Sequence, residues 1–208
     1  MKTILLTSAG VQVIDELIKI LPKSPRETKL AHIITAAKGE TNTAYADREG
    51  TSLLKAGFQM TEIDIEGQTE EDLRKALEGF DVIYVQGGNS FYLLKCAKES
   101  GFDKVAKDLT EKGTIYVGVS AGSYIACPTI EMAYWKHPDR NAVGLKDLTG
   151  LDLVPFLLSV HYKPEYNEIL KKEISAAKYS VRILTDDQAI LVQDDTITLV
   201  GKGDEVRI

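Results

Sequence analysis

Short apolar runs alternate with stretches of helical periodicity along the first 120 residues. The apolar runs are rich in aliphatic and β-branched residues and lie at 3–7, 30–36, 81–85 and 114–119, and a further strand pattern at 58–65 alternates loosely between apolar and polar residues. Between them, apolar side chains recur every three or four positions, which is typical of helices with one buried face. These stretches cover 13–21, 43–56, 70–79, 91–99 and 103–112. Gly57 directly follows the second of them, where a left-handed residue would end the helix.

This alternation of strands and helices predicts βαβ units and a mostly parallel sheet. Strands with nearly continuous apolar residues fit such a sheet, because helices cover both of its faces. The chain ends differently, with three closely spaced strand patterns at 181–184, 189–193 and 196–200. Asp194 and Asp195 separate the last two patterns and indicate a hairpin. We therefore expect a three-layer α/β fold with a C-terminal antiparallel extension.

Length and composition indicate one ordinary globular domain. A chain of 208 residues fits a single domain spanning 1–208, with a core that needs no disulfide or metal. The net charge of −6 gives no electrostatic help to a nucleic acid or an anionic membrane. The apolar runs are too short for a membrane span or a secretion signal. We expect a cytoplasmic protein, a monomer or small homo-oligomer, with Cys96 and Cys127 reduced and buried.

The segment Gly118-Val119-Ser120-Ala121-Gly122 carries the clearest candidate chemistry. It follows a predicted buried strand and opens a helical segment, which is the setting in which G-x-S-x-G forms a nucleophile turn. Such a turn lifts the serine hydroxyl above the carboxyl edge of the sheet, where open α/β sheets bind ligands. The N–H of Ala121 would then face the oxyanion of an attacked carbonyl group. The alternative is a glycine-flanked turn in which Ser120 only caps the helix.

A second glycine-rich turn, Gln86-Gly87-Gly88-Asn89-Ser90, also lies between a predicted strand and a helix. Adjacent glycines let a ligand approach the backbone closely and permit positive φ angles. If this loop lies beside Ser120, the N–H of Gly88 is the second oxyanion donor, and Asn89 joins it in binding the substrate. The alternatives are a helix start capped by Asn89 or Ser90, and a phosphate cradle, although the lysine-containing phosphate-loop sequence is absent.

A serine nucleophile needs a general base, and the chain contains three histidines. His32 lies within an apolar strand pattern, which is typical of a core residue. His137 lies in a polar loop and is expected to be solvated. His161 ends the apolar run 156–160 and precedes a polar loop, so it would emerge at the sheet edge where ligands bind. We therefore favour His161 as the base.

The base in turn needs a carboxylate that orients the imidazole. Asp186 and Asp187 follow the strand pattern at 181–185 and could approach His161 from a neighbouring strand end. Paired aspartates are also common in β-turns. Composition alone favours this second, structural interpretation.

Taken together, these segments resemble the aspartyl dipeptidase (dipeptidase E) and cyanophycinase family of serine peptidases. The similar stretches follow one another in order at 85–94, 115–123, 126–130, 155–162 and 184–189. The resemblance implies a fold like that of class I glutamine amidotransferase domains, which is flavodoxin-like, with serine in place of cysteine at the nucleophile turn. It implies Ser120 as nucleophile, His161 as base and Asp186 as acid, with Asp187 as the fallback. Gly88 and Ala121 would donate to the oxyanion.

The resemblance also implies an activity. We expect a serine peptidase that hydrolyses short peptides, as a dipeptidase does, without a metal or organic cofactor. The family's pattern has an arginine and later an aspartate where this chain has Glu131 and Trp135. If both lie at the pocket rim, Glu131 would repel an acidic side chain and favour peptides that begin with a neutral or basic residue. Two alternatives stay open: an esterase or amidase using the same site, and a catalytically silent binding module.

Overall fold

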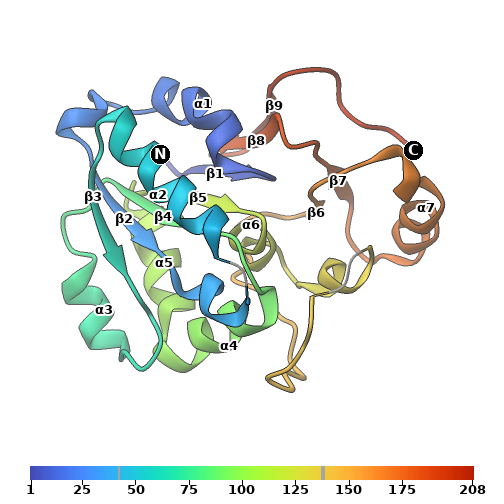
Figure 1. Ribbon diagram of the computed structural model, residues 1–208, viewed down its shortest axis with the longest axis horizontal. Helices are drawn as coiled ribbons and strands as arrows, with labels where there is room; N and C mark the ends of the chain where they lie inside the picture. The colour runs from blue at the N-terminus through green and yellow to red at the C-terminus, as the bar shows by residue number, and fades with distance from the viewer. Residues whose placement is uncertain (42, 137–138) are drawn as a thin grey trace.

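The structure is a computed structural model that describes residues 1–41, 43–136 and 139–208. Figure 1 shows a central twisted sheet with helices packed around it. The strands are hydrogen-bonded in the order β3-β2-β4-β5-β1-β8-β9. Five of them run parallel: β1 (Thr3–Thr7), β2 (Lys29–Ile33), β3 (Gln59–Ile63), β4 (Val82–Val85) and β5 (Ile115–Val119). The predicted α/β fold with a mostly parallel sheet is therefore confirmed.

Two hydrophobic clusters, one on each face of this sheet, form the core. Leu17 and Leu53 anchor α1 (Ile14–Lys19) and α2 (Ala44–Ala56) in the first cluster. The second cluster takes in the helices α3 (Glu70–Ala76), α4 (Ser90–Ser100), α5 (Phe102–Glu111) and α6 (Ala121–Ala126). Along β1, Leu5 joins the first cluster, whereas Ile4 and Leu6 join the second. Both faces are covered, which explains why β1, β4 and β5 are buried along their whole length, whereas the edge strand β3 keeps exposed polar residues.

The predicted elements differ from the observed ones mainly at their ends. The strand predicted over 30–36 ends at Ile33, because Thr35–Gly39 forms the 3-10 helix η3. The helix predicted over 13–21 begins as a 3-10 turn, η1 (Gly10–Val13). Gly57 ends α2 as predicted, with a left-handed φ of 99°. Within the described ranges, none of the helices combines the length and apolar character that crossing a bilayer requires.

The C-terminal antiparallel extension consists of two strands rather than three. β8 (Gln188–Gln193) pairs antiparallel with β1, and β9 (Thr196–Gly201) pairs antiparallel with β8. The predicted hairpin turn joins them, and Asp194 in it has a φ of 50°. The third predicted strand, β7 (Val181–Ile183), instead pairs parallel with β6 (Leu157–Ser159) in a separate two-stranded sheet. That part of the prediction was wrong, because local patterns do not reveal so distant a partner.

The two-stranded sheet and α7 (Asn167–Ala176) lie to one side of the main sheet (Figure 1). Leu157, Leu158 and Val160 are buried in the same cluster as α4 and α6. This packing ties the small sheet to the main one. The residue His161, just after β6, thereby reaches Ser8, just after β1, with its backbone N–H 2.8 Å from the Ser8 hydroxyl oxygen.

Candidate active site

Ser120 lies on a strained turn between β5 and α6. Its backbone has a φ of 48° and a ψ of −105°, a combination that L-residues rarely adopt and that persists only where the surroundings fix it. The Ser120 N–H donates to the carbonyl oxygen of Thr7 at 2.9 Å, and the Ser120 carbonyl accepts the N–H of Tyr124 at 2.9 Å. The segment therefore forms the predicted strand-to-helix turn.

The two glycines of this turn are needed because backbone packs directly against them. A Cβ on Gly118 would lie 2.6 Å from the Gly122 carbonyl oxygen, and a Cβ on Gly122 would lie 2.1 Å from the Val85 carbonyl oxygen. Both separations are far below van der Waals contact, so a larger residue would push α6 away from the sheet. The glycines thus set how closely the serine turn approaches β4 and β5.

The Ser120 hydroxyl begins a chain of three side chains. Its Oγ lies 3.1 Å from Nε2 of His161, and Nδ1 of His161 lies 2.6 Å from Oδ1 of Asp186. The hydrogen bond with His161 is the largest cause that lowers the pKa of Asp186 to about 2, so this carboxyl group is ionised at neutral pH. An ionised acid at Nδ1 and a hydroxyl at Nε2 are the arrangement in which an imidazole can take a serine proton.

Strand pairing explains why these side chains meet. β1 and β5 are parallel neighbours in register, so Ser8 and Ser120, which follow them, leave the sheet side by side. β6 and β7 are also parallel neighbours, and His161 and Asp186 follow their carboxyl ends. All four side chains therefore gather at the carboxyl ends of strands, the edge where open α/β sheets bind ligands.

Ser8 is a member of this group that the sequence analysis misses. It is 1% exposed, and its Oγ lies 2.5 Å from Oδ1 of Asp186 and 3.0 Å from Nδ1 of His161. The residue directly follows β1, but neither a motif nor a periodicity marks it. Only the strand order, which brings β1 beside β5, reveals its position.

The predicted glycine-rich loop lies beside the nucleophile turn. A Cβ on Gly87 would lie 3.2 Å from the Cβ of Ser120. Gly88 lines the same cavity as Ser120. It has a φ of 144° and packs closely against η3, because a Cβ on it would lie 2.4 Å from the Ala36 carbonyl oxygen. Ala121 is the first residue of α6, so its N–H has no acceptor within that helix.

Asn89 caps α4. Its Oδ1 accepts the N–H of Tyr92 at 3.0 Å, and its Nδ2 donates to the Arg140 carbonyl oxygen at 3.0 Å. The residue is 5% exposed and belongs to the lining of neither cavity described next. The geometry therefore supports the helix-capping alternative for Asn89, and its place in substrate binding stays a prediction.

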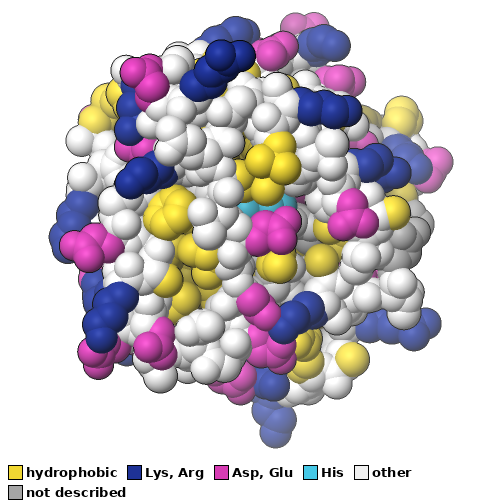
Figure 2. Space-filling view, turned by 60° about the vertical axis from the view of Figure 1, so that its left-hand side comes forward, with side chains coloured by type: hydrophobic (Ala, Val, Ile, Leu, Met, Phe, Trp, Pro, Cys, Tyr) yellow, Lys and Arg dark blue, Asp and Glu magenta, His cyan; other side chains and the backbone are white. Residues whose placement is uncertain are grey.

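Two cavities meet at Ser120. The larger has a volume of about 800 Å³ and extends between η1 and α2. The smaller has a volume of about 110 Å³. Ser120, His161 and Asp139 line both of them, and the smaller is completed by Ser90, Tyr124, Met132, Ala133, Lys136, Val160 and Tyr166. Figure 2 shows histidine surface set back between hydrophobic and acidic side chains.

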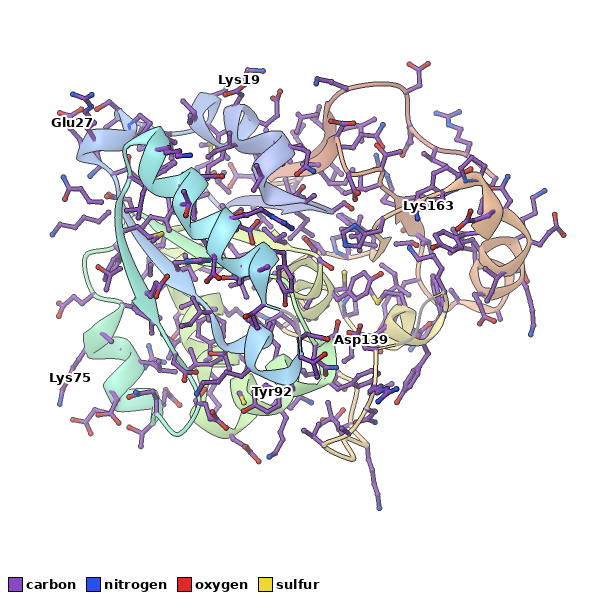
Figure 3. The ribbon with its side chains drawn as sticks, in the orientation of Figure 1. Lys19, Glu27, Lys75, Tyr92, Asp139 and Lys163 are labelled. Carbon is purple, nitrogen blue, oxygen red and sulfur yellow. The ribbon has the colours of Figure 1, made fainter. Side chains whose placement is uncertain are left out.

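Lys136 and Asp139 bring opposite charges to the smaller cavity. The Lys136 ammonium donates to the Val160 carbonyl oxygen, and burial lowers the pKa of this lysine to about 8. The Asp139 carboxylate accepts the N–H of Ser90 at 2.8 Å, and burial raises its pKa. Figure 3 shows Asp139 between the main sheet and the C-terminal part of the chain. Sequence reasoning missed both residues, because they lie in a polar loop without a motif.

The other predicted site residues lie apart from the reacting hydroxyl. Trp135 is 6% exposed and belongs to the core, and Glu131 begins the 3-10 helix η4 (Glu131–Tyr134). Neither belongs to the lining of these two cavities, so this geometry gives no support to a place for them at the pocket rim. Lys136, one residue further on, faces the cavity instead. Asp187 lies 4.0 Å from the ammonium of Lys202, so Asp186 is the aspartate that reaches the imidazole.

Of the remaining predicted residues, His32 and both cysteines are buried as expected. The His32 ring packs edge-to-face on Tyr84 with centroids 5.5 Å apart, and burial lowers the pKa of this histidine to about 4. Cys96 and Cys127 are free thiols in the core. His137 lies outside the described residues.

Comparison with known proteins connects this geometry to a family. The model of peptidase family S51 matches residues 4–200. An uncharacterized peptidase of Listeria innocua is 29% identical over 207 residues, which are 98% of this chain and 99% of that relative. Peptidase E of Nostoc sp. is 27% identical over 184 residues and matches 83% of this chain and 72% of its own length.

Solved structures agree with the sequence comparison. A crystal structure of a candidate peptidase E from Listeria monocytogenes EGD-e has a TM-score of 0.87 and 28% identity, and the match covers 98% of this chain and all of that one (100%). A peptidase from an acI-B1 Actinobacterium shares the fold, with a TM-score of 0.68, 12% identity and coverage of 97% and 88%. Because the family model spans nearly the whole sequence, the chain belongs to peptidase family S51.

Proposed function

We propose that the protein is a serine exopeptidase that hydrolyses short peptides, with Ser120, His161 and Asp186 as its catalytic side chains. The observation that carries the proposal is the chain of contacts from Ser120 Oγ to His161 at 3.1 Å and on to Asp186 at 2.6 Å. Family membership favours a peptide bond as the substrate. The strained backbone of Ser120 supports a reactive role over a capping one, since such strain gathers at functional sites.

In the first step, Ser120 Oγ bonds to the scissile carbonyl carbon while Nε2 of His161 takes the hydroxyl proton. The carbonyl oxygen becomes an oxyanion, which the N–H groups of Gly88 and Ala121 stabilise. The C–N bond then breaks, and His161 gives its proton to the leaving amine. In the second step, water bonds to the acyl carbon while His161 takes one of its protons; the bond between this carbon and Ser120 Oγ then breaks, His161 gives the proton to Oγ, and the carboxylic acid leaves. Asp186 stabilises the imidazolium in both steps.

The smaller cavity supports cleavage next to the N-terminus of a peptide. Its volume of about 110 Å³ suits a single small side chain beside Ser120. Asp139 lies where the two cavities meet. A protonated α-amino group bound there would neutralise a carboxylate that is half-buried, and such carboxylates are usually paired. The larger cavity would then hold the residue on the leaving-amine side.

Lys136 supports an acidic first residue, opposite to the preference predicted from Glu131. Its ammonium lines the smaller cavity and is cationic below a pH of about 8. A carboxylate 4 Å from it would be attracted by about 4 kcal/mol at an effective dielectric constant near 20. A short acidic side chain, such as that of aspartate, therefore fits both the volume and the charge.

Rates on Asp-Leu, Leu-Leu and Lys-Leu, each with a free or an acetylated N-terminus, test this proposal. We expect the highest kcat/KM for free Asp-Leu, no cleavage of acetylated peptides and no hydrolysis by Ser120→Ala. Lys136→Met should lower kcat/KM for Asp-Leu and leave that for Leu-Leu nearly unchanged. Efficient cleavage of acetylated peptides, or of simple esters alone, would contradict the exopeptidase proposal. An equal loss on all three dipeptides in Lys136→Met would contradict the role given to Lys136.

A further inference from the structure

The Ser8 hydroxyl makes three contacts with the two residues behind Ser120. The backbone N–H of His161 donates to Ser8 Oγ at 2.8 Å. The same oxygen lies 3.0 Å from Nδ1 of His161, and its hydroxyl group donates to Oδ1 of Asp186 at 2.5 Å. Ser8 is buried, whereas the side chains of His161 and Asp186 are about half exposed, so water reaches these contacts only from the side of the imidazole and the carboxylate.

The number of available protons gives each contact its direction. A serine hydroxyl has one proton to donate and two lone pairs. One lone pair of Ser8 accepts the backbone N–H of His161. Asp186 is ionised and can only accept, so Nδ1 of His161, 2.6 Å from its Oδ1, must carry the proton of that contact and cannot also accept one from Ser8. The Ser8 proton therefore goes to Asp186, and its second lone pair faces the Nδ1–H. All partners are satisfied only when the imidazole proton is on Nδ1, which turns the basic Nε2 toward Ser120.

Ser8 also holds a strained backbone. His161 has a left-handed φ of 53°, which is uncommon for a residue other than glycine. Two hydrogen bonds fix it there: the His161 N–H to Ser8 Oγ, and the Tyr162 N–H to the Leu184 carbonyl oxygen at 2.9 Å. The first bond comes from the end of β1 and the second from the end of β7. Ser8 thus joins the main sheet, which carries Ser120, to the small sheet, which carries His161.

The backbone around Ser8 is itself fixed on both sides. The N–H of Thr7 donates to Oγ of Ser123 at 3.0 Å. A Cβ on Gly10 would lie 1.8 Å from the Tyr84 hydroxyl and 2.4 Å from the Glu49 carboxylate, so this part of the loop is closely packed. The Ser8 hydroxyl is therefore held in place before a substrate binds, as an efficient supporting residue must be.

We propose that Ser8 is a positioning residue: it holds His161 in the tautomer and orientation that accept the Ser120 proton, and it fixes the Asp186 carboxylate. The inference rests on the proposed function, because it assigns Ser8 a part in the same proton transfer. Ser8 acts through the imidazole and the carboxylate and takes no part in bond making.

Ser8→Ala removes one oxygen atom and is the direct test. With free Asp-Leu, we expect kcat to fall by about 10- to 100-fold, the size typical of one lost hydrogen bond to a charged group, with KM nearly unchanged. Ser100→Ala is the matched control, because Ser100 is also a buried serine and donates to the Cys96 carbonyl oxygen at 2.7 Å, far from the site. It should lower stability and leave kcat unchanged. If Ser8→Ala does not fold, Ser8→Cys fills the space with a much weaker hydrogen-bonding group and should show the same loss.

Coupling to Asp186 separates positioning from a general structural role. In an Asp186→Ala background, Ser8→Ala should lower kcat little further, because groups that act as one unit are not additive. An equal loss in both backgrounds would show that Ser8 acts only through the stability of the fold and would overturn the proposal.

The nitrogen chemical shifts of ¹⁵N-labelled imidazole report the tautomer of His161 without any substrate. We expect the Nδ1–H form in the unmodified protein and a mixture of tautomers in Ser8→Ala. If a fluorophosphonate leaves Ser120 unmodified while the tautomer still changes in Ser8→Ala, the proposed function fails and the positioning inference stands. If Ser120 reacts and Ser8→Ala changes neither the tautomer nor kcat, the positioning inference fails and the proposed function stands.

Discussion

Glu49 lines the larger cavity, with 5% of its surface exposed. Its carboxyl group accepts a hydrogen bond from the Tyr84 hydroxyl at 2.8 Å. Burial raises the pKa of its carboxyl group from 4.5 to about 7, and at 1.36 kcal/mol per pH unit this shift amounts to about 3 kcal/mol. Between these two pH values the folded protein keeps a proton that the unfolded chain has lost. The free energy of unfolding should therefore fall by about 3 kcal/mol as the pH rises from 4.5 to 7. Above pH 7 the contribution of Glu49 to the free energy of unfolding no longer changes with pH.

Glu49→Gln removes this titration and keeps the size of the side chain. The assay is urea unfolding of both proteins at pH 4.5, 6 and 7.5. Between pH 4.5 and 7.5, the unfolding free energy of Glu49→Gln should rise by about 3 kcal/mol relative to that of the unmodified protein. The comparison with Glu49→Gln is needed because His32 acts in the opposite direction. Burial lowers the pKa of His32 from 6.5 to about 4, so this residue makes the free energy of unfolding fall as the pH drops below 6.5. A difference that does not depend on pH would refute the inference that the folded protein keeps Glu49 protonated.

Further predictions concern the proposed chemistry. His161→Ala should lower kcat on Asp-Leu as far as Ser120→Ala does, on the order of 10⁶-fold, and a smaller loss would question His161 as the base. Asp186→Asn should cost on the order of 10⁴-fold in kcat, whereas Asp187→Asn should cost little; the reverse order would make Asp187 the acid. Because the pKa of Lys136 is lowered to about 8, the KM for Asp-Leu should rise above pH 8 relative to that for Leu-Leu, and parallel KM profiles would contradict this.

The sheet could be predicted from the sequence wherever the information is local. The run Thr3–Thr7 coincides with β1, and Gly57 ends α2, because apolar runs and a left-handed C-cap depend on neighbouring residues only. The strand at 181–184 was assigned to the wrong sheet, because its partner β6 lies more than twenty positions earlier and carries no matching signal. Strand order is likewise a non-local property, and the pattern of apolar residues does not contain it.

The residues of the candidate site likewise fall into those marked by local sequence and those that only the three-dimensional structure reveals. Ser120 stands in a local motif, and His161 follows a strand end, so both could be found by pattern. Asp186 and Asp187 share one turn, and only the three-dimensional structure shows which of them faces the imidazole. Ser8 was missed because its role depends on β1 lying beside β5.

Lys136 was missed for a related reason. It faces the smaller cavity only because of the irregular path of the chain after α6, which has no periodicity to interpret. The same irregular path buries Trp135 in the core. The charge at the pocket could therefore not be assigned correctly from the sequence.

Treatment of the unmodified protein with a fluorophosphonate, followed by peptide mapping of the adduct by mass spectrometry, tests directly whether Ser120 is the nucleophile of a hydrolase. We expect one phosphonyl adduct per chain, on Ser120, with parallel loss of dipeptide hydrolysis, and no adduct in His161→Ala on the same timescale. An adduct on another residue, or full dipeptidase activity in a protein whose Ser120 is modified, would contradict the role proposed for Ser120.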